Sequence, residues 1–271
     1  MKLTVEGKTI GFFDFDYRSI SDKIGVSVSG GSDSALMFYL MAKHLKDVTL
    51  IPRHAIEEHN DPLKSRPNSI FPTEKVIEYV KNKFPDADIA ETYVFEIPRD
   101  DESMLAKARE LNQPGWKHYP MSDKGVAKML HMEKDWKHAY KIGMYGLLCG
   151  GSTMNPPQEV LDSFSKEYDT KVKTLPGKNP KKFWYELRRS KINDQGPFIM
   201  KDGLPSYKPF AAVDKKFLAG IYKQEGIMDL HDLTESCTGY AADTNWFTEP
   251  CKKCFWCYER KWAFGSYGRE S

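Results

Sequence analysis

A run of small and polar residues near the amino terminus has the composition of a phosphate-binding turn. It comprises Ser29, Gly30, Gly31, Ser32, Asp33 and Ser34. The glycines let the backbone approach a ligand with no Cβ in the way, and N–H groups at the start of a helix favour negative charge. The serines can donate hydroxyl hydrogen bonds, and Asp33 can cap the helix or help to hold Mg²⁺. This chemistry suits a bound phosphate.

The alternative for this run is an ordinary glycine–serine turn that Asp33 caps. Its position in the chain argues against that alternative. Residues 24–28 form a short β-branched run typical of a buried parallel strand, and residues 35–45 carry the apolar spacing of a helix. A strand, a glycine-rich turn and a helix open a βαβ unit. The run is not a Walker sequence, because it lacks both the GxxxxGK spacing and the lysine.

Four of the five cysteines gather near the carboxyl terminus, at Cys237, Cys251, Cys254 and Cys257. We call them the cysteine knuckle. The last three are spaced at i, i+3 and i+6, so a tight turn can direct their thiolates at one tetrahedral ion, with Cys237 as the fourth ligand. A closed site of four cysteines has no open coordination position, which indicates a structural Zn²⁺ site. An iron–sulfur cluster uses the same ligands and is the alternative hypothesis for this site. The fifth cysteine, Cys149, is expected in the core.

The loop and the knuckle together resemble one family. The loop matches the Ser-Gly-Gly-x-Asp-Ser signature of the PP-loop, or N-type, ATP pyrophosphatases. With the knuckle near the carboxyl terminus, the chain resembles the 7-cyano-7-deazaguanine synthases. The likeness includes the Lys208-Pro209-Phe210 segment, the helix led by Lys215, and Arg260 after the cysteines. It covers residues 24–52 and 205–264.

This resemblance implies an ATP-dependent carbon–nitrogen ligase. Such an enzyme adenylates the carboxylate of a 7-carboxy-7-deazaguanine-type substrate and releases pyrophosphate; ammonia then displaces AMP, and a second ATP converts the amide to a nitrile. The resemblance also implies that residues 29–34 bind ATP with Mg²⁺, that Ser29, Asp33 and Ser34 are catalytic, and that the knuckle holds Zn²⁺. Arg53 and His54, at the end of the second strand, would face the nucleotide.

The acceptor side is where the chain departs from this family. It lacks the Pro-Gly-Arg-Asn turn ahead of the mid-chain helix, and residues 150–157 replace a Tyr-Pro-Asp-Cys-Arg segment. The candidates for substrate binding there are Gly151, Ser152, Thr153 and Asn155. Their polar groups could read the edge of a heterocycle by hydrogen bonds. An ordinary strand-to-helix turn is the equal alternative.

The elements that must position these residues alternate between strand and helix. Strands are expected at residues 24–28, 48–51, 92–97 and 144–149, with one or two edge strands in residues 1–23. We expect Pro52 to end the second strand. Helices are expected at residues 34–45, 72–84, 123–142 and 217–221. This order predicts an α/β fold with a doubly wound, mostly parallel sheet, and the resemblance implies that it is adenine nucleotide alpha hydrolase-like.

We expect two domains in this chain of 271 residues. Residues 1–205 would form the ATP-binding domain, with a lid or excursion in residues 155–205, and residues 206–271 a helical region that binds zinc through the knuckle. The net charge of +2 argues against a dedicated duplex-binding protein. No run approaches the roughly 18 apolar residues that a membrane span needs, and no signal peptide precedes the first strand. We therefore expect a cytoplasmic enzyme.

The expected partners are a small deazapurine-type substrate and ammonia, with no membrane; a homodimer is compatible with the sequence. Residues 178–191 are basic and aromatic and could bind nucleic acid, although a solvated lid helix is the favoured reading. This stretch keeps a tRNA-thiolating PP-loop enzyme open as an alternative. A thiolating enzyme would need a reactive cysteine pair, however, and only Cys149 lies outside the knuckle. A protein that senses ATP without turnover is the third hypothesis.

Overall fold

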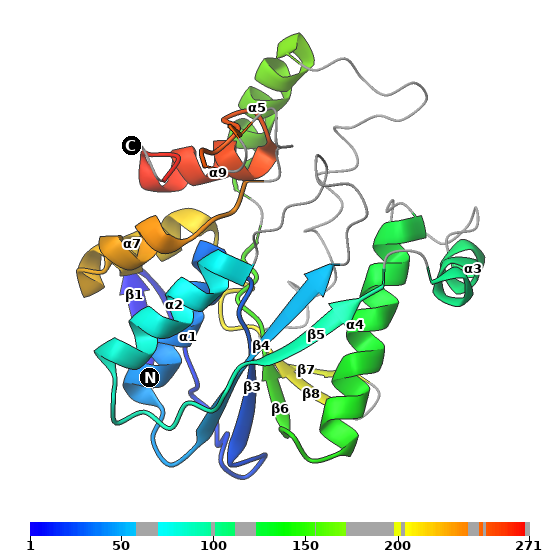
Figure 1. Cartoon of the computed structure of the whole chain (residues 1–271). Helices are drawn as coiled ribbons and strands as arrows, with labels where there is room; N and C mark the ends of the chain where they lie inside the picture. Colours follow the sequence, from blue (N-terminus) through cyan, green and yellow to red (C-terminus); the bar gives the residue numbers. More distant parts are fainter. Residues whose placement is uncertain are drawn as a thin grey trace.

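A computed structural model describes residues 1–57, 70–98, 101–111, 123–154, 156–171, 198–201, 204–237, 244–245 and 248–268. In this part of the chain, six strands form one sheet in the order β5-β4-β3-β6-β8-β7 (Figure 1). They are β3 (Lys23–Ser27), β4 (Thr49–Glu57), β5 (Tyr93–Ile97), β6 (Leu147–Cys149), β7 (Phe198–Lys201) and β8 (Leu204–Tyr207). Neighbouring strands from β5 to β8 are parallel, and β7 is antiparallel to β8. The prediction of a mostly parallel sheet is confirmed.

Helices cover both faces of this sheet. The described helices are α1 (Ser32–His44), α2 (Ile70–Lys83), α3 (Glu102–Leu111), α4 (Asp123–Lys141), α5 (Gln158–Lys171), α7 (Lys215–Glu225), α8 (Met228–Leu233) and α9 (Phe255–Phe264). Figure 1 shows α1 and α2 on one face, α4 on the other, and α5 and α9 beyond the carboxyl ends of the strands. The sheet is therefore doubly wound. None of the described helices is long and apolar enough to cross a membrane.

The core is built around α1. Its side chains are buried almost without a break from Ser34 to Ala42, so the helix is apolar on all sides and packs within the protein. Ile24 and Val26 of β3 join the same core. The turn between them therefore joins two elements of the same core.

Pro52 does not end the second strand, contrary to our expectation, because β4 continues to Glu57. A proline lacks the N–H group that a central strand needs. Leu50 bonds through its N–H and its carbonyl to the stretch that precedes β5. Pro52 turns its nitrogen to the same side, since alternate residues of a parallel strand face the same neighbour. The pairing of β4 with β5 begins only at Arg53, so the missing N–H falls in a gap of the ladder.

The amino-terminal residues form a separate hairpin. β1 (Lys2–Val5) and β2 (Lys8–Gly11) pair antiparallel in a two-stranded sheet of their own, so they are not edge strands of the main sheet. The hairpin packs on α7, where a Cβ on Gly220 would lie 2.3 Å from Val5 Cγ1. The residues before β3 therefore brace the helix that follows the sheet.

Other expected elements are present with different bounds. The helix predicted at residues 72–84 begins at Ile70, and the strand predicted at residues 144–149 is only Leu147–Cys149. The helix predicted after Asp214 is confirmed, and Asp214 accepts a cap bond from Phe217 N–H. α3 was not predicted, and α5 occupies part of the expected excursion. The division at residues 205 and 206 stays a prediction, although β8 spans both positions.

Candidate functional site

The predicted phosphate loop lies where β3 ends and α1 begins. α1 starts at Ser32, with Gly31 as its N-cap, and no side chain caps it. The first turn of a helix has N–H groups without partners inside the helix. Together with the helix dipole, they make this turn a place for an anion. The predicted strand–turn–helix arrangement is confirmed, and phosphate binding by the loop stays a prediction.

Ser34 fixes the shape of the loop from within the first turn. Its Oγ accepts the N–H of Ser29 at 3.1 Å and donates to the carbonyl of Gly31 at 3.0 Å. The Oγ atoms of Ser29 and Ser34 are also 3.1 Å apart. Ser34 is buried, whereas Ser29 is exposed at the surface of the loop. Ser29 is thus the better placed of the two to reach a ligand.

Gly30 allows the loop to approach α2 and the carboxyl-terminal region. Its φ of +75° favours glycine, and a Cβ there would lie 2.8 Å from Pro72 Cβ. Its carbonyl accepts the N–H of Glu235 at 2.8 Å. Two segments far apart in the chain, at Pro72 and at Glu235, therefore lie against the turn.

Asp33, which is partly buried, lies at the centre of a polar network. Its Oδ1 is 3.2 Å from Lys215 Nζ and also accepts from Ser32 Oγ, and its Oδ2 accepts from Thr153 Oγ1 at 3.1 Å. Lys215 Nζ is also 3.3 Å from Glu259 Oε2. Lys215 is 2% exposed and Glu259 is fully buried. The ammonium therefore joins the phosphate loop to α9.

Sequence reasoning assigned no site role to Lys215 or Glu259. Lysine and glutamate are almost never fully buried unless they are paired, so their burial indicates that they act together. The one sequence signal was the position of Lys215 at the start of a helix. Glu259 offered no signal beyond its place two residues after the last cysteine.

His54 and Arg53, both predicted to face ATP, lie on opposite faces of the sheet. His54 Nδ1 is 2.8 Å from the carbonyl oxygen of Val28, so an N–H at this position can donate to it. The same Nδ1 is 3.3 Å from Thr73 Oγ1. Burial lowers the pKa of His54, which keeps the imidazole neutral at pH 7. His54 therefore supports the strand end behind the loop.

The Arg53 side chain turns toward α4. Its Nε and Nη2 donate to Asp135 Oδ2 at 3.1 and 2.6 Å, and the guanidinium lies 4.1 Å from the centre of the Phe95 ring. The structure does not bring Arg53 together with the loop. A contact of either residue with ATP stays a prediction.

The candidates for acceptor binding fall into two groups. Gly151 packs against the start of α1, where a Cβ would lie 2.5 Å from the carbonyl oxygen of Asp33, and Thr153 bonds to the Asp33 carboxylate. Ser152, between them, is exposed. Asn155 lies outside the described residues, as does the stretch 178–191. Gly151 and Thr153 therefore brace Asp33, and Ser152 has the exposure that a substrate contact requires.

The cysteine knuckle is assembled as predicted. The Sγ atoms of Cys237, Cys251, Cys254 and Cys257 all lie within 4.8 Å of one another. The N–H groups of Cys251 and Cys254 donate to the sulfurs of Cys237 and Cys251, at 3.1 and 3.3 Å. Metal–sulfur bonds of about 2.3 Å in a tetrahedron place sulfurs about 3.8 Å apart. The group therefore fits a single tetrahedral metal ion, and Cys149 is buried elsewhere, where burial raises its thiol pKa.

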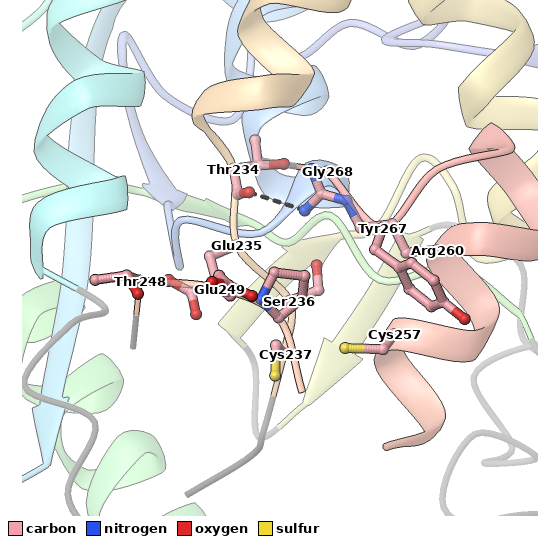
Figure 2. Close-up of a pocket in the computed structure, with 11 residues that line it drawn as sticks. Thr234, Glu235, Ser236, Cys237, Thr248, Glu249, Cys257, Arg260, Tyr267 and Gly268 are labelled. Carbon is pink, nitrogen blue, oxygen red and sulfur yellow. Dashed lines mark hydrogen bonds between the residues drawn. The ribbon is translucent and has the colours of Figure 1, made fainter. Parts of the chain in front are cut away.

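α9 links the cysteine knuckle to the phosphate loop. It contains Cys257 and, two and three residues further on, Glu259 and Arg260. Arg260 donates to the carbonyl of Thr234 at 2.8 Å (Figure 2). It also donates to the carbonyl of His231 at 2.8 Å. The segment that follows α8 then reaches Gly30 through the N–H of Glu235. α9 thus holds the loop by two routes, through Lys215 and through this segment.

The sequence matches no protein-family model and no curated protein. Solved structures with a similar course of the chain include an NMN synthetase from Francisella tularensis, with 14% identity and a TM-score of 0.46 over 93% of this chain and 80% of that one. An NAD⁺ synthetase from Burkholderia pseudomallei has 13% identity and a TM-score of 0.40 over 90% and 74% of the two chains.

A tRNA thiolase from Methanococcus maripaludis, solved with its 4Fe–4S cluster, has 12% identity and a TM-score of 0.36. That alignment covers 76% of this chain and 56% of the thiolase. All three likenesses are distant. We therefore derive the function from the residues of the loop and its surroundings.

Proposed function

We propose that this chain is an ATP pyrophosphatase of the PP-loop type that activates a carboxylate by adenylation. The observation that carries this proposal is the Ser-Gly-Gly-Ser-Asp-Ser turn at the carboxyl end of β3, with an uncapped helix start behind it. Strand ends at this edge of an open α/β sheet are where such folds bind ligands. The proposed acceptor is the carboxylate of a 7-carboxy-7-deazaguanine-type ring, which the resemblance of loop and knuckle supports.

In the proposed reaction, a carboxylate oxygen attacks the α-phosphorus of ATP, and the bond to the bridging oxygen breaks to release pyrophosphate. Ammonia then attacks the acyl carbon, loses a proton and displaces AMP, which leaves an amide. With a second ATP, the amide oxygen attacks the α-phosphorus and releases a second pyrophosphate, and loss of AMP and both N–H protons then leaves a nitrile. The chain's own part is to bind the phosphates and to hold both substrates in line.

The loop residues have distinct roles in this proposal. The N–H groups at the start of α1 bind the departing pyrophosphate, and the exposed Ser29 Oγ donates to a phosphate oxygen. Ser34 keeps the loop closed, through its bonds to Ser29 and Gly31. Asp33 offers carboxylate oxygens, the ligand type that Mg²⁺ prefers. When bound, Mg²⁺ would neutralise charge on the phosphates.

The metal at the knuckle is proposed to be a structural Zn²⁺. Four cysteine sulfurs close the coordination sphere, so no position is left for a substrate. A cubane cluster would bind each thiolate to a different iron and would need the sulfurs further apart. The sulfur spacing therefore favours a single ion.

The decisive experiment measures pyrophosphate and AMP formation from ATP, with mass spectrometry of the products. We expect release that depends on 7-carboxy-7-deazaguanine, with the amide or nitrile formed when ammonium is present. Ser29→Ala should slow this release, whereas Ser19→Ala, at an exposed position outside the loop, should not. Release stimulated only by tRNA, or no release with any acceptor, would contradict the proposal.

A further inference from the structure

A buried tyrosine on α7 reaches the helix that starts at the phosphate loop. The hydroxyl of Tyr222 donates to the carbonyl of Ser32, the first residue of α1, at 2.8 Å and across 190 positions of the chain. Tyr222 is fully buried. Burial raises the pKa of its hydroxyl, so the group keeps its proton and acts as a donor. No role has been assigned to this residue so far.

Two aromatic contacts fix the direction of this hydroxyl. The ring of Tyr222 packs edge-on against His231 of α8 and against Phe264 of α9, with ring centres 5.7 and 5.5 Å apart. A ring that is packed on several sides in a dense core has little freedom to turn. The position of the donor is therefore set by three helices before any ligand arrives.

The bond to the Ser32 carbonyl acts on the other end of the same peptide group. The carbonyl of Ser32 and the N–H of Asp33 belong to one planar unit. A donor at the carbonyl oxygen polarises this unit, which makes its N–H a stronger donor in turn. The N–H of Asp33 lies in the first turn of α1, where N–H groups have no acceptor inside the helix. Tyr222 therefore orients and strengthens one of the groups that face a phosphate.

The two preceding peptide groups are held in the same way. The carbonyl of Gly30 accepts the N–H of Glu235 at 2.8 Å, and the carbonyl of Gly31 accepts from Ser34 Oγ at 3.0 Å. The N–H groups at the other ends of these units are those of Gly31 and Ser32. Three consecutive carbonyls behind the loop thus each accept a hydrogen bond. Only the tyrosine's bond comes from a side chain outside the loop, so one substitution can remove it alone.

We propose that Tyr222 is a positioning residue of the phosphate loop, which acts through the Ser32 carbonyl to direct and strengthen the Asp33 N–H toward pyrophosphate. This inference rests on the proposed function, in which the first turn of α1 binds the phosphates of ATP. Its consequence is specific, because the hydroxyl contributes to the binding of phosphate groups and not to the binding of the acceptor.

Calorimetric titration of the metal-loaded protein with inorganic pyrophosphate and Mg²⁺ tests this directly. We expect Tyr222→Phe to bind pyrophosphate about fivefold more weakly than the wild type, because it keeps the packed ring and loses the donor. Tyr145→Phe is the matched control. Tyr145 is 1% exposed, and its hydroxyl has no hydrogen-bond partner within the part of the chain that the structure describes. Its removal should leave the affinity for pyrophosphate unchanged.

Two further measurements separate positioning from general stability. The amide nitrogen resonance of Asp33 reports the hydrogen bond at the preceding carbonyl, so it should move in Tyr222→Phe and stay in place in Tyr145→Phe. A second variant, Tyr222→3-fluorotyrosine, keeps the ring and makes the hydroxyl a stronger donor. We expect it to bind pyrophosphate at least as tightly as the wild type, which a loss of packing would not produce.

The outcomes distinguish this inference from the proposed function. Affinity of Tyr222→Phe equal to that of the wild type, an equal loss in Tyr145→Phe, or weaker binding by the fluorinated variant overturns the positioning role and leaves the adenylation standing. Failure of pyrophosphate to bind the wild type overturns both. The expected weakening in Tyr222→Phe, without pyrophosphate release from ATP in the presence of any acceptor, keeps the positioning role and overturns the proposed reaction.

Discussion

Lys215 Nζ lies 3.2 Å from Asp33 Oδ1, across 182 positions of the chain, and joins the phosphate loop to the region of the cysteine knuckle. The same ammonium contacts Glu259 on α9. Buried charges are stable only when each is compensated. The two carboxylates therefore depend on one lysine, and the loop depends on the packing of α9.

Replacement of this lysine should destabilise the protein strongly. We expect Lys215→Met to lower the free energy of unfolding by about 3 kcal/mol, because it leaves two carboxylates without their cation. Lys216→Met is the matched control, since Lys216 is exposed beside it. Urea unfolding measures both. If the added change Glu259→Gln does not restore part of the loss in Lys215→Met, the pair is not the source of the effect.

The local motifs of this site could be predicted from the sequence, because each is made by residues close together in the chain. The strand before the loop, the helix after it and the knuckle spacing all follow from short-range patterns. The Lys215–Asp33 contact joins residues that no spacing rule relates. Only the packing of α7 and α9 against the loop brings them together.

The prediction for Arg53 and His54 treated two neighbours on one strand as one site. Successive residues of a strand point to opposite faces, so only one of them could share the face of the loop. Strand alternation was the signal available from sequence. The end of β4 was predicted wrongly for a different reason. A proline ends a strand only where the neighbouring strand has a carbonyl that needs the missing N–H, and the sequence around Pro52 does not reveal this.

Gly30 should be required for ATP binding. An alanine there would combine a positive φ with a clash against Pro72, so the loop must shift. We expect Gly30→Ala to weaken ATP binding at least about tenfold, since a displaced loop misplaces several N–H donors at once. Equilibrium titration with ATP measures this.

Gly143→Ala separates strain from the clash. Gly143 has a φ of +69°, but a Cβ there would meet nothing within 4 Å. We expect it to cost about 1 kcal/mol of stability and to leave ATP affinity unchanged. Equal losses of affinity in the two variants would show that the contact with Pro72 is unimportant.

Metal removal should destabilise the chain and disturb the ATP loop. We expect about one Zn²⁺ per chain, and chelation should lower the free energy of unfolding by about 3 kcal/mol or more, because the knuckle folds with its ion. Cys254→Ser should lose metal in the same way. Cys149→Ala, outside the knuckle, should keep it. Full stability after chelation, or metal-free protein on isolation, would contradict a structural metal site.

His231 should make the protein sensitive to mild acid. It is fully buried and stacks on Phe264 with ring centres 3.9 Å apart. Burial, then the charges of Arg260 and Lys215, lowers its pKa to about 3 from an ordinary value of 6.5. Asp232 Oδ1, 3.3 Å from Nδ1, is the carboxylate that faces the ring. The folded protein therefore keeps this imidazole neutral where the unfolded chain protonates it.

The direction of the effect follows from proton binding. Between pH 6.5 and 3 the unfolded state holds a proton that the folded state does not, so this histidine costs stability as the pH falls. The wild type should lose about 2 kcal/mol more than His231→Phe between pH 7 and pH 5. Phenylalanine keeps the stacking and removes the titrating group. Urea unfolding at both pH values, with metal content checked, gives this difference; parallel losses in the two proteins would mean that His231 is protonated in the folded state.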